Sequence, residues 1–362
     1  MFLLYFQYYM RIGFLVGKDD EIYDDDYLFN LTPKKHLAQG MYDEPLLHTD
    51  VAIAITIRDS YPDIQVDIIQ PREISNQRLQ KNNVNFILGY DCINQMVSDP
   101  YVKKFDGKQG YQLLKNIYGS PKNKVFPPMN FLEFIWAKDK YLSTFQRKKI
   151  PISPTIVVSS YSTPKIIGNV QKRGWKQFII KPVGGTIAIG VERFNLQDCL
   201  KNPLLITDYF NEHKEYYPKF LIQELIQGFK KHGEIKMFWI NNEYSYAVNT
   251  IDRGDGDQDK YTVKPVQQSK ILQQCKVIGK SVLQALPKIR VNNQVVKPVL
   301  VRTDFTCCQE NKSHSPQNYY LNEVEHQDAG SYVTYENIKY PYVQVMADSF
   351  VKKAQELVSL GF

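Results

Sequence analysis

The chain has 362 residues, of which 43% are hydrophobic and 23% charged, and its formal net charge is +7. These values are ordinary for a soluble globular protein of two or three domains. The basic residues are scattered along the sequence instead of forming a stripe. This argues against a nucleic-acid partner and favours basic groups that face a small anionic molecule.

The five cysteines are odd in number and include no CxxC pair. We therefore expect neither a disulfide framework nor a zinc site, and we expect a reducing, cytoplasmic location. The apolar start, residues 1–9, is too short to span a membrane and lacks the basic region and cleavage site of a signal peptide. No other segment is suited to span a bilayer, so no membrane partner is expected.

The first part of the chain alternates predicted strands and helices. A buried strand is expected at residues 11–17, an acidic loop at 19–26, a helix around 50–60, and strands at 64–71 and 84–91. This alternation predicts a small parallel α/β unit. The proline-rich VFPPM, residues 125–129, is a plausible boundary.

The rest of the chain predicts shorter strands. They are expected at residues 154–159, 177–182, 190–194 and 220–226, followed by a hairpin over 234–250 that turns at Asn241 and Asn242. A helix over 269–286, strands over 298–308 and 319–325, and a final amphipathic helix over 342–360 complete the prediction.

Two of these strands carry charged residues on one face. Arg302 and Asp304 lie two apart in VLVRTDF, and Glu323 and Glu325 lie two apart in YYLNEVE. If the two strands pair antiparallel, all four side chains converge on one site. Three carboxylates this close require cations, and an oxygen-rich site suits Mg²⁺. The alternative is a solvated sheet face with an arginine–carboxylate pair.

A glycine-rich turn gives a second signal. In FIIKPVGGT, Lys181 ends a strand just before Gly184, Gly185 and Thr186. Glycines let backbone N–H groups approach phosphate oxygens, and the lysine adds a positive charge. A plain hairpin turn is the alternative.

The strand FLIQELI gives a third signal. Its end, at Gln223, Glu224 and Leu225, could pair its backbone with the edge of an adenine ring. An ordinary core strand is the alternative.

Together these motifs resemble the ATP-grasp superfamily. They occur in its order: Lys140 within AKDKYLSTFQRKKIPISPT, Lys181 within FIIKPVGGT, QELI, and RTDF followed by NEVE. The last pair is most similar to the carboxylate–amine ligase branch, which includes D-alanine–D-alanine ligases and has R-x-D-F and N-E-x-N. The segment DKYTVKP, residues 259–265, resembles that branch's lysine–tyrosine loop.

The resemblance implies an α/β fold in which antiparallel sheets clamp ATP. Its expected parts are a pre-ATP-grasp unit at residues 10–124, a lid subdomain at 125–226 and a catalytic subdomain at 227–362.

The resemblance also implies roles for single residues. Lys140 and Lys181 would hold the α- and β-phosphates, residues 184–186 would form the lid loop, and Glu224 and Leu225 would bind adenine. Lys260 would approach the γ-phosphate. Glu234 is a candidate for the ribose or for orienting Lys236, with a surface charge as the alternative.

The remaining implied roles belong to the charged pair of strands. Asp304 and Glu323 would ligate two Mg²⁺ ions, with Mn²⁺ as a substitute, and Arg302 would stabilise the charge that develops at the attacked carbonyl. Glu325 departs from the pattern, because it stands where the branch has Asn, and it is expected as a further metal ligand. HQDAG replaces the usual Pro-Gly, so His326 and Asp328 are candidate substrate contacts.

The implied activity is that of an ATP- and Mg²⁺-dependent ligase. It would join a small-molecule carboxylate and an amine, on amino acids or short peptides, through an acyl phosphate. One alternative is a kinase for a hydroxyl of a polyol or inositol phosphate, which Arg302 beside Asp304 disfavours. Another is an ATP-binding protein without turnover. Homodimers are common in the resembled branch, and the acidic loop is either an ammonium site or a solvated loop.

Overall fold

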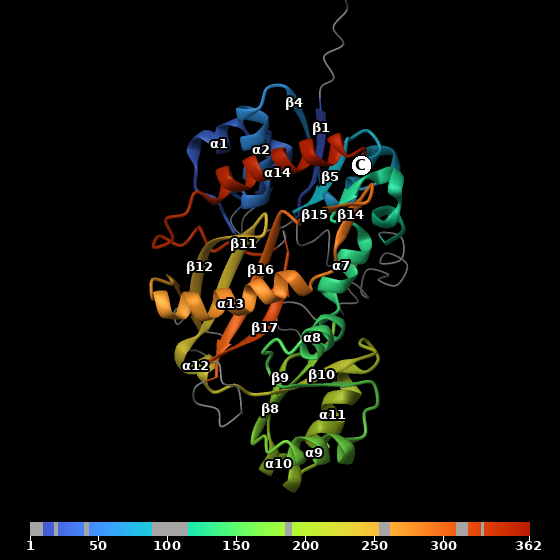
Figure 1. The fold of residues 1–362 in the computed structure, drawn as a ribbon, viewed down its shortest axis with the longest axis vertical. Coiled ribbons are helices and arrows are strands. Elements are labelled where there is room, and N and C mark those ends of the chain that lie inside the picture. The colour runs from blue at the N-terminus through green and yellow to red at the C-terminus, as the bar shows by residue number, and fades with distance from the viewer. Residues whose placement is uncertain are drawn as a thin grey trace, which may run out of the picture.

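A computed structural model describes residues 10–17, 21–39, 43–88, 115–184, 190–252, 261–308, 318–326 and 329–362. Three larger sheets lie one below another along the long axis of the molecule (Figure 1). A parallel sheet lies at one end, a five-stranded antiparallel sheet in the middle and a four-stranded antiparallel sheet at the other end. The predicted α/β fold class is therefore confirmed.

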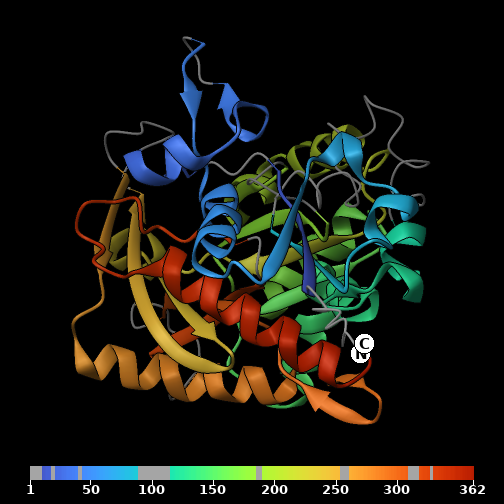
Figure 2. The same cartoon turned by 90° about the horizontal axis from the view of Figure 1, so that it is seen from above.

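The parallel sheet has the order β4 (Ile64–Ile69), β1 (Met10–Leu15), β5 (Val84–Ile87) and β6 (Val125–Phe126). Each neighbouring pair runs parallel, as the alternation of strands and helices predicts. Helix α2 (Thr49–Ser60) packs against β4, and the C-terminal helix α14 (Tyr342–Ser359) packs against α2 and β5 (Figure 2). The C-terminal helix α14 is thus part of the same α/β unit as the N-terminal strands and helix α2.

The four-stranded antiparallel sheet has the order β7 (Thr155–Val158), β10 (Phe220–Glu224), β8 (Gln177–Pro182) and β9 (Glu192–Asn195). Alternate residues such as Phe178 and Ile180 point to a face that packs on α9 (Thr163–Lys172), α10 (Leu196–Lys201) and α11 (Leu204–His213). Lys181 alternates with them and points to the opposite face. This sheet and its helices are called the lid here.

The five-stranded sheet has the order β13 (Tyr261–Pro265), β12 (Glu243–Asp252), β11 (Glu234–Ile240), β16 (Leu300–Cys307) and β17 (Tyr319–Glu325). Asn241 and Asn242 connect β11 to β12 with φ of 52° and 65°, the left-handed geometry that a two-residue hairpin turn requires. One face of the sheet packs on α13 (Ser269–Ala285), where Gly279 lies against Trp239. The other face carries the charged residues described below.

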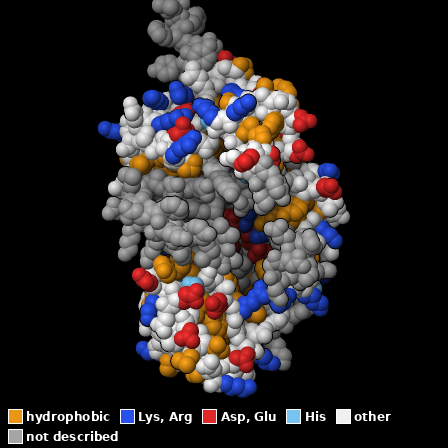
Figure 3. Space-filling model, turned by 180° about the vertical axis from the view of Figure 1, so that it is seen from behind, with side chains coloured by type: hydrophobic (Ala, Val, Ile, Leu, Met, Phe, Trp, Pro, Cys, Tyr) orange, Lys and Arg blue, Asp and Glu red, His pale blue; other side chains and the backbone are white. Residues whose placement is uncertain are grey.

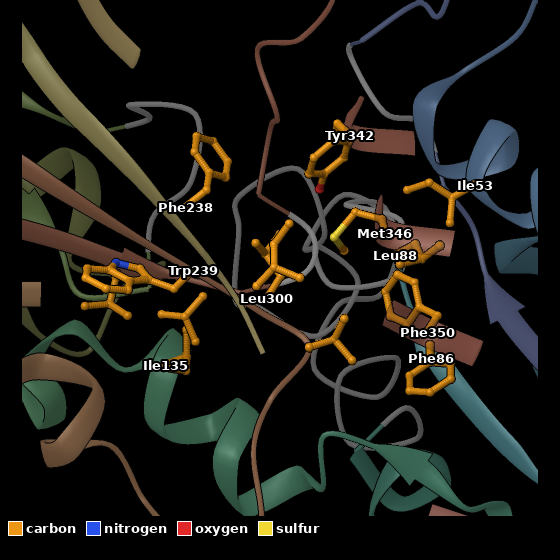
Figure 4. Packing of buried hydrophobic residues seen from close by; sticks show 14 of the residues in the cluster. Ile53, Phe86, Leu88, Ile135, Phe238, Trp239, Leu300, Tyr342, Met346 and Phe350 are labelled. Carbon is orange, nitrogen blue, oxygen red and sulfur yellow. The ribbon is translucent and has the colours of Figure 1, made fainter. Parts of the chain in front are cut away.

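A continuous hydrophobic cluster joins the five-stranded sheet to the parallel sheet (Figure 4). Phe350 of α14 lies against Phe86 of β5, with ring centroids 4.8 Å apart, and Met346, Leu300 and Phe238 continue the cluster toward the five-stranded sheet. The lid has a separate cluster of its own. The five-stranded sheet and the parallel sheet therefore pack as one layered body, to which the lid is attached.

The predicted domain boundaries remain predictions. The structure adds that β6 follows the first boundary and pairs with β5. The sequence did not predict α10, α11 or β13, whose residues 261–265 were expected in a loop. The described residues also form further elements that the sequence did not predict: α1 (Asp26–Leu31), η1 (Lys34–His36), β2 (Ala38–Gln39), β3 (Pro45–Leu46), η2 (Pro71–Glu73), α3 (Asn76–Leu79), η3 (Pro121–Asn123), α7 (Met129–Trp136), α8 (Lys138–Arg147), α12 (Gly228–His232), β14 (Ile289–Val291) and β15 (Gln294–Val296). None of the helices in the described ranges is long and apolar enough to cross a bilayer.

Candidate functional site

The two charged strands pair antiparallel, and their charged faces coincide. Arg302 lies opposite Glu325 and Asp304 opposite Glu323. The register then slips by one residue, so that Asn322 is an extra residue of β17 with no partner in β16. Such a bulge turns the extra side chain away from strict alternation. Asn322 thereby reaches the charged face, where its Nδ2 donates to Glu234 at 2.8 Å.

Cations of the sheet hold the central carboxylate. Arg302 donates from Nε and from a terminal nitrogen to the two oxygens of Asp304, both at 2.9 Å. It also lies 2.7 Å from Glu325. On the other side, Lys236 of β11 contacts Asp304 at 2.9 Å and Glu234 at 2.7 Å. Bidentate and charge-assisted contacts of this kind are strong, and they keep the face rigid.

The sequence predicts Lys236 only as a residue that Glu234 could orient. The contact between the two side chains is present, and Lys236 also reaches Asp304. The role of Glu234 toward a ribose stays a prediction.

A lysine of α8 reaches the cluster, but it is not the one that the resemblance singled out. Lys138 lies 2.6 Å from Glu323. Lys140 is exposed, because two positions along a helix turn the side chain by about 200°. This arrangement does not support the predicted contact between Lys140 and a phosphate.

The carboxylates differ in protonation. Burial alone would raise the pKa of Glu323, but Lys138 and Lys181 outweigh it and lower that pKa to about 2. For Glu325, burial outweighs the attraction of Arg302, and the carboxylates of Asp304 and Glu323 add repulsion, so the pKa rises to about 7. Of the two glutamates, the one that stands in the usual Asn position therefore holds a proton more readily.

The lid contributes Lys181, which β8 directs toward the charged face. Burial lowers the pKa of Lys181 to about 8, with the positive charge of Lys138 adding to this and Glu323 and Glu234 opposing it. No hydrogen bond or ion pair of its ammonium group is seen among the described residues. A buried cation in this position is suited to receive a phosphate. Gly184 follows on the same hairpin, whereas Gly185 and Thr186 lie outside the described residues.

The predicted adenine segment lies at the end of β10, where the lid meets the five-stranded sheet. Gln223 is buried, and its side chain donates to Thr155. The backbone N–H groups of Glu224 and Leu225 donate to Pro154 and Gln177, each at 3.0 Å. Because these N–H groups already donate within the protein, the predicted contact with adenine would use the backbone carbonyl groups of the two residues. A pocket of about 420 Å³ adjoins this segment and includes Leu225 in its lining.

Residues 330–332, which follow β17 in the chain, lie beside the charged face. The carboxylate of Glu21 accepts hydrogen bonds from the Ser331 hydroxyl and the Tyr332 backbone N–H. Tyr332 has a φ of 62°, which is rare for a residue with a side chain. Its ring lies 5.8 Å from the Arg302 guanidinium and 5.7 Å from the Lys236 ammonium. Sequence reasoning placed no role on Tyr332, and nothing local in its sequence signals one.

Three predicted site residues cannot be placed with these. Lys260 and Asp328 lie outside the described residues, as do Asp19 and Asp20 of the predicted acidic loop. His326 is fully buried, with its ring centroid 5.8 Å from that of Trp136.

The carboxylates fit a divalent cation by their geometry and chemistry. One oxygen each from Asp304, Glu323 and Glu325 lie within 4.8 Å of one another. All three are hard oxygen donors, which Mg²⁺ and Mn²⁺ prefer. From behind, acidic and basic side chains lie together at the bottom of a hollow between the parallel-sheet end and the lid (Figure 3).

No model of a known protein family matches the sequence. No curated protein matches it either.

Solved structures, in contrast, are similar to the chain over almost its whole length. The D-cycloserine synthetase DcsG superposes with a TM-score of 0.64 at 13% identity, covering 96% of this chain and 99% of its own. The D-alanine–D-alanine ligase from Bacillus anthracis, solved with ATP, has a TM-score of 0.58 at 10% identity and coverage of 98% and 100%. The ATP-grasp ligase PsnB, solved with a minimal precursor, has a TM-score of 0.58 at 10% identity and coverage of 95% and 99%. The chain therefore has the ATP-grasp fold, with D-alanine–D-alanine ligases among its structural neighbours.

Proposed function

We propose that this protein is an ATP- and Mg²⁺-dependent carboxylate–amine ligase that acts on amino acids or short peptides through an acyl phosphate. The observation that carries the proposal is the cluster on β16 and β17. There, Asp304, Glu323 and Glu325 place oxygens within 4.8 Å of one another beside Arg302. The structural neighbours, which include a D-alanine–D-alanine ligase solved with ATP and PsnB solved with Mg and ADP, support it.

The chemistry follows from positioning and charge. An oxygen of the carboxylate substrate attacks the γ-phosphorus of ATP, and ADP leaves with the electrons of the broken bond. The amine then attacks the acyl carbon, phosphate leaves, and the nitrogen loses a proton to form the amide. Mg²⁺ ions held by Asp304 and Glu323 would neutralise the phosphates during the first transfer.

The protein's own residues would act on the second step. The Arg302 guanidinium is buried and fixed by Asp304 and by the carbonyl of Gly330. A fixed cation stabilises a developing oxyanion better than a mobile one, because it does not have to reorganise. The Tyr332 ring beside it would form one wall of the substrate pocket. No Ser–His or Cys–His nucleophile is required.

A substrate screen tests the proposal. We expect ADP release to depend on adding both a carboxylic acid and an amine, with a product mass equal to their sum less one water. Hydroxylamine in place of the amine should trap the acyl phosphate as a hydroxamate. ADP release that responds to an inositol phosphate or sugar alcohol, and to no amino acid or peptide, would favour a kinase instead.

A further inference from the structure

Each of the three candidate metal ligands already contacts a cation of the chain. Asp304 contacts Arg302 and Lys236, Glu325 contacts Arg302, and Glu323 contacts Lys138. A carboxylate oxygen that faces an ammonium group cannot coordinate Mg²⁺ at the same time. Both oxygens of Asp304 and one oxygen each of Glu323 and Glu325 are occupied in this way, so a metal ion competes with the cations for these oxygens.

The three cations differ in how easily they can move. Arg302 and Lys236 belong to the same sheet as their partners, and their side chains are only 5% and 9% exposed. Lys138 comes from α8, outside the sheet, on a flexible four-carbon stem that is 18% exposed. It is the cation best able to leave its carboxylate.

The position of Lys138 shows where it could go. It lies close enough to Lys181 to lower the pKa of that lysine. The repulsion between two nearby ammonium groups is offset by an anion that attracts both, and Glu323, which contacts Lys138 at 2.6 Å and is also attracted to Lys181, is such an anion. When a cation occupies Glu323, a phosphate is the group that can take its place between the two lysines.

We propose that Lys138 is an exchange cation, which pairs with Glu323 in the nucleotide-free protein and transfers to a phosphate oxygen when a divalent cation binds Glu323. The inference rests on the proposed function, since it needs ATP and a metal at this site. The exchange makes metal and nucleotide binding mutually dependent. A metal ion on Glu323 releases Lys138 for a phosphate, and a phosphate that binds Lys138 frees Glu323 for a metal ion. Lys138 and not Lys140 is then the α8 lysine that contacts the nucleotide.

The test measures binding without turnover, on the full-length protein. Mn²⁺ affinity is determined by electron paramagnetic resonance with and without a β,γ-imido analogue of ATP. Lys138→Met should bind Mn²⁺ alone about tenfold more tightly than wild type, because no ammonium competes for Glu323. It should bind the analogue about tenfold more weakly, and the factor by which the analogue tightens Mn²⁺ binding should fall about as much.

Two controls separate exchange from general charge effects. Lys148→Met removes the same charge from an exposed position just after α8, and it should leave the metal–nucleotide coupling factor unchanged. Lys138→Gln should repeat the Lys138→Met result, and thermal unfolding checks that both variants fold.

The outcomes distinguish the two proposals. Unchanged or weaker Mn²⁺ binding by the Lys138 variants, with wild type binding both ligands, overturns the exchange and leaves the ligase proposal standing. So does a loss of coupling in Lys140→Met but not in Lys138→Met. If wild type binds neither Mn²⁺ nor the analogue, the proposed function fails, and the exchange fails with it.

Discussion

The Lys236 ammonium lies 2.9 Å from Oδ2 of Asp304, and that same oxygen accepts a hydrogen bond from Arg302 at 2.9 Å. One buried oxygen thus accepts hydrogen bonds from two cations, Lys236 of the neighbouring strand β11 and Arg302 of its own strand β16. Asp304 lies between β11 and β17 in the sheet, and its carboxylate is only 1% exposed. The residue therefore has a structural role in addition to its proposed metal contact.

Asp304→Ala should consequently cost more stability than Glu323→Ala. Removing Asp304 leaves two buried cations without their shared carboxylate, and breaking a buried pair typically costs about 3–5 kcal/mol. Glu323 is 23% exposed, and its partner Lys138 is not fully buried, so its loss should cost less. Urea unfolding gives both values, and ADP release should be abolished in each variant. Retained ATP turnover in Glu323→Ala would refute its metal role.

Glu325→Gln should change how stability depends on pH. The pKa of Glu325 in the folded protein is about 7, above its ordinary 4.5. Between these values the folded protein keeps a proton that the unfolded chain releases, so this group lowers the free energy of unfolding as pH rises. The stability of the variant relative to wild type should therefore increase as the pH is raised from about 5 to about 8. Urea unfolding without nucleotide measures it, and an equal gain at both pH values would contradict the assignment.

The sequence predicted the charged face well because strand alternation is a local property. Arg302 and Asp304 must share a face of any regular strand, and so must Glu323 and Glu325. The flanking residues are apolar enough to predict both strands, and the predicted ends of these strands differ from the observed ends by two residues or fewer. Only the pairing of the two strands had to be assumed.

The rest of the site depends on tertiary structure. Which α8 lysine faces Glu323 depends on the residue at which the helix begins, and boundaries are the least predictable feature of a helix. The contact of Asn322 with Glu234 depends on a bulge that no residue type in NEVE signals. Tyr332 reaches Arg302 through a left-handed backbone that Glu21, 311 residues away in sequence, helps to hold.

Lys181→Met should stabilise the nucleotide-free protein while weakening ATP binding. The pKa of Lys181 in the folded protein is about 8, against an ordinary 10.5. This difference corresponds to a cost of about 3 kcal/mol, present in full below about pH 8 and lost as pH rises toward the ordinary value. The variant should thus be more stable than wild type at neutral pH, with the difference shrinking in alkaline buffer. Urea unfolding and calorimetric titration with an ATP analogue measure the two effects. A variant that keeps wild-type nucleotide affinity would rule out the phosphate role.

Gly279→Ala should destabilise the protein, although alanine favours helices. A Cβ on Gly279 of α13 would lie 2.3 Å from Cζ2 of Trp239, a fully buried ring whose Nε1 donates to Thr303 at 2.9 Å. The ring cannot shift without breaking that bond, and overpacking of this kind costs about 1–3 kcal/mol. Gly168 of α9 is the matched control, because a Cβ there meets no atom within 4 Å. Gly168→Ala should instead be neutral or gain up to about 1 kcal/mol from helix propensity alone. Comparing the two urea midpoints separates packing from propensity, and equal shifts would show that α13 does not press on Trp239.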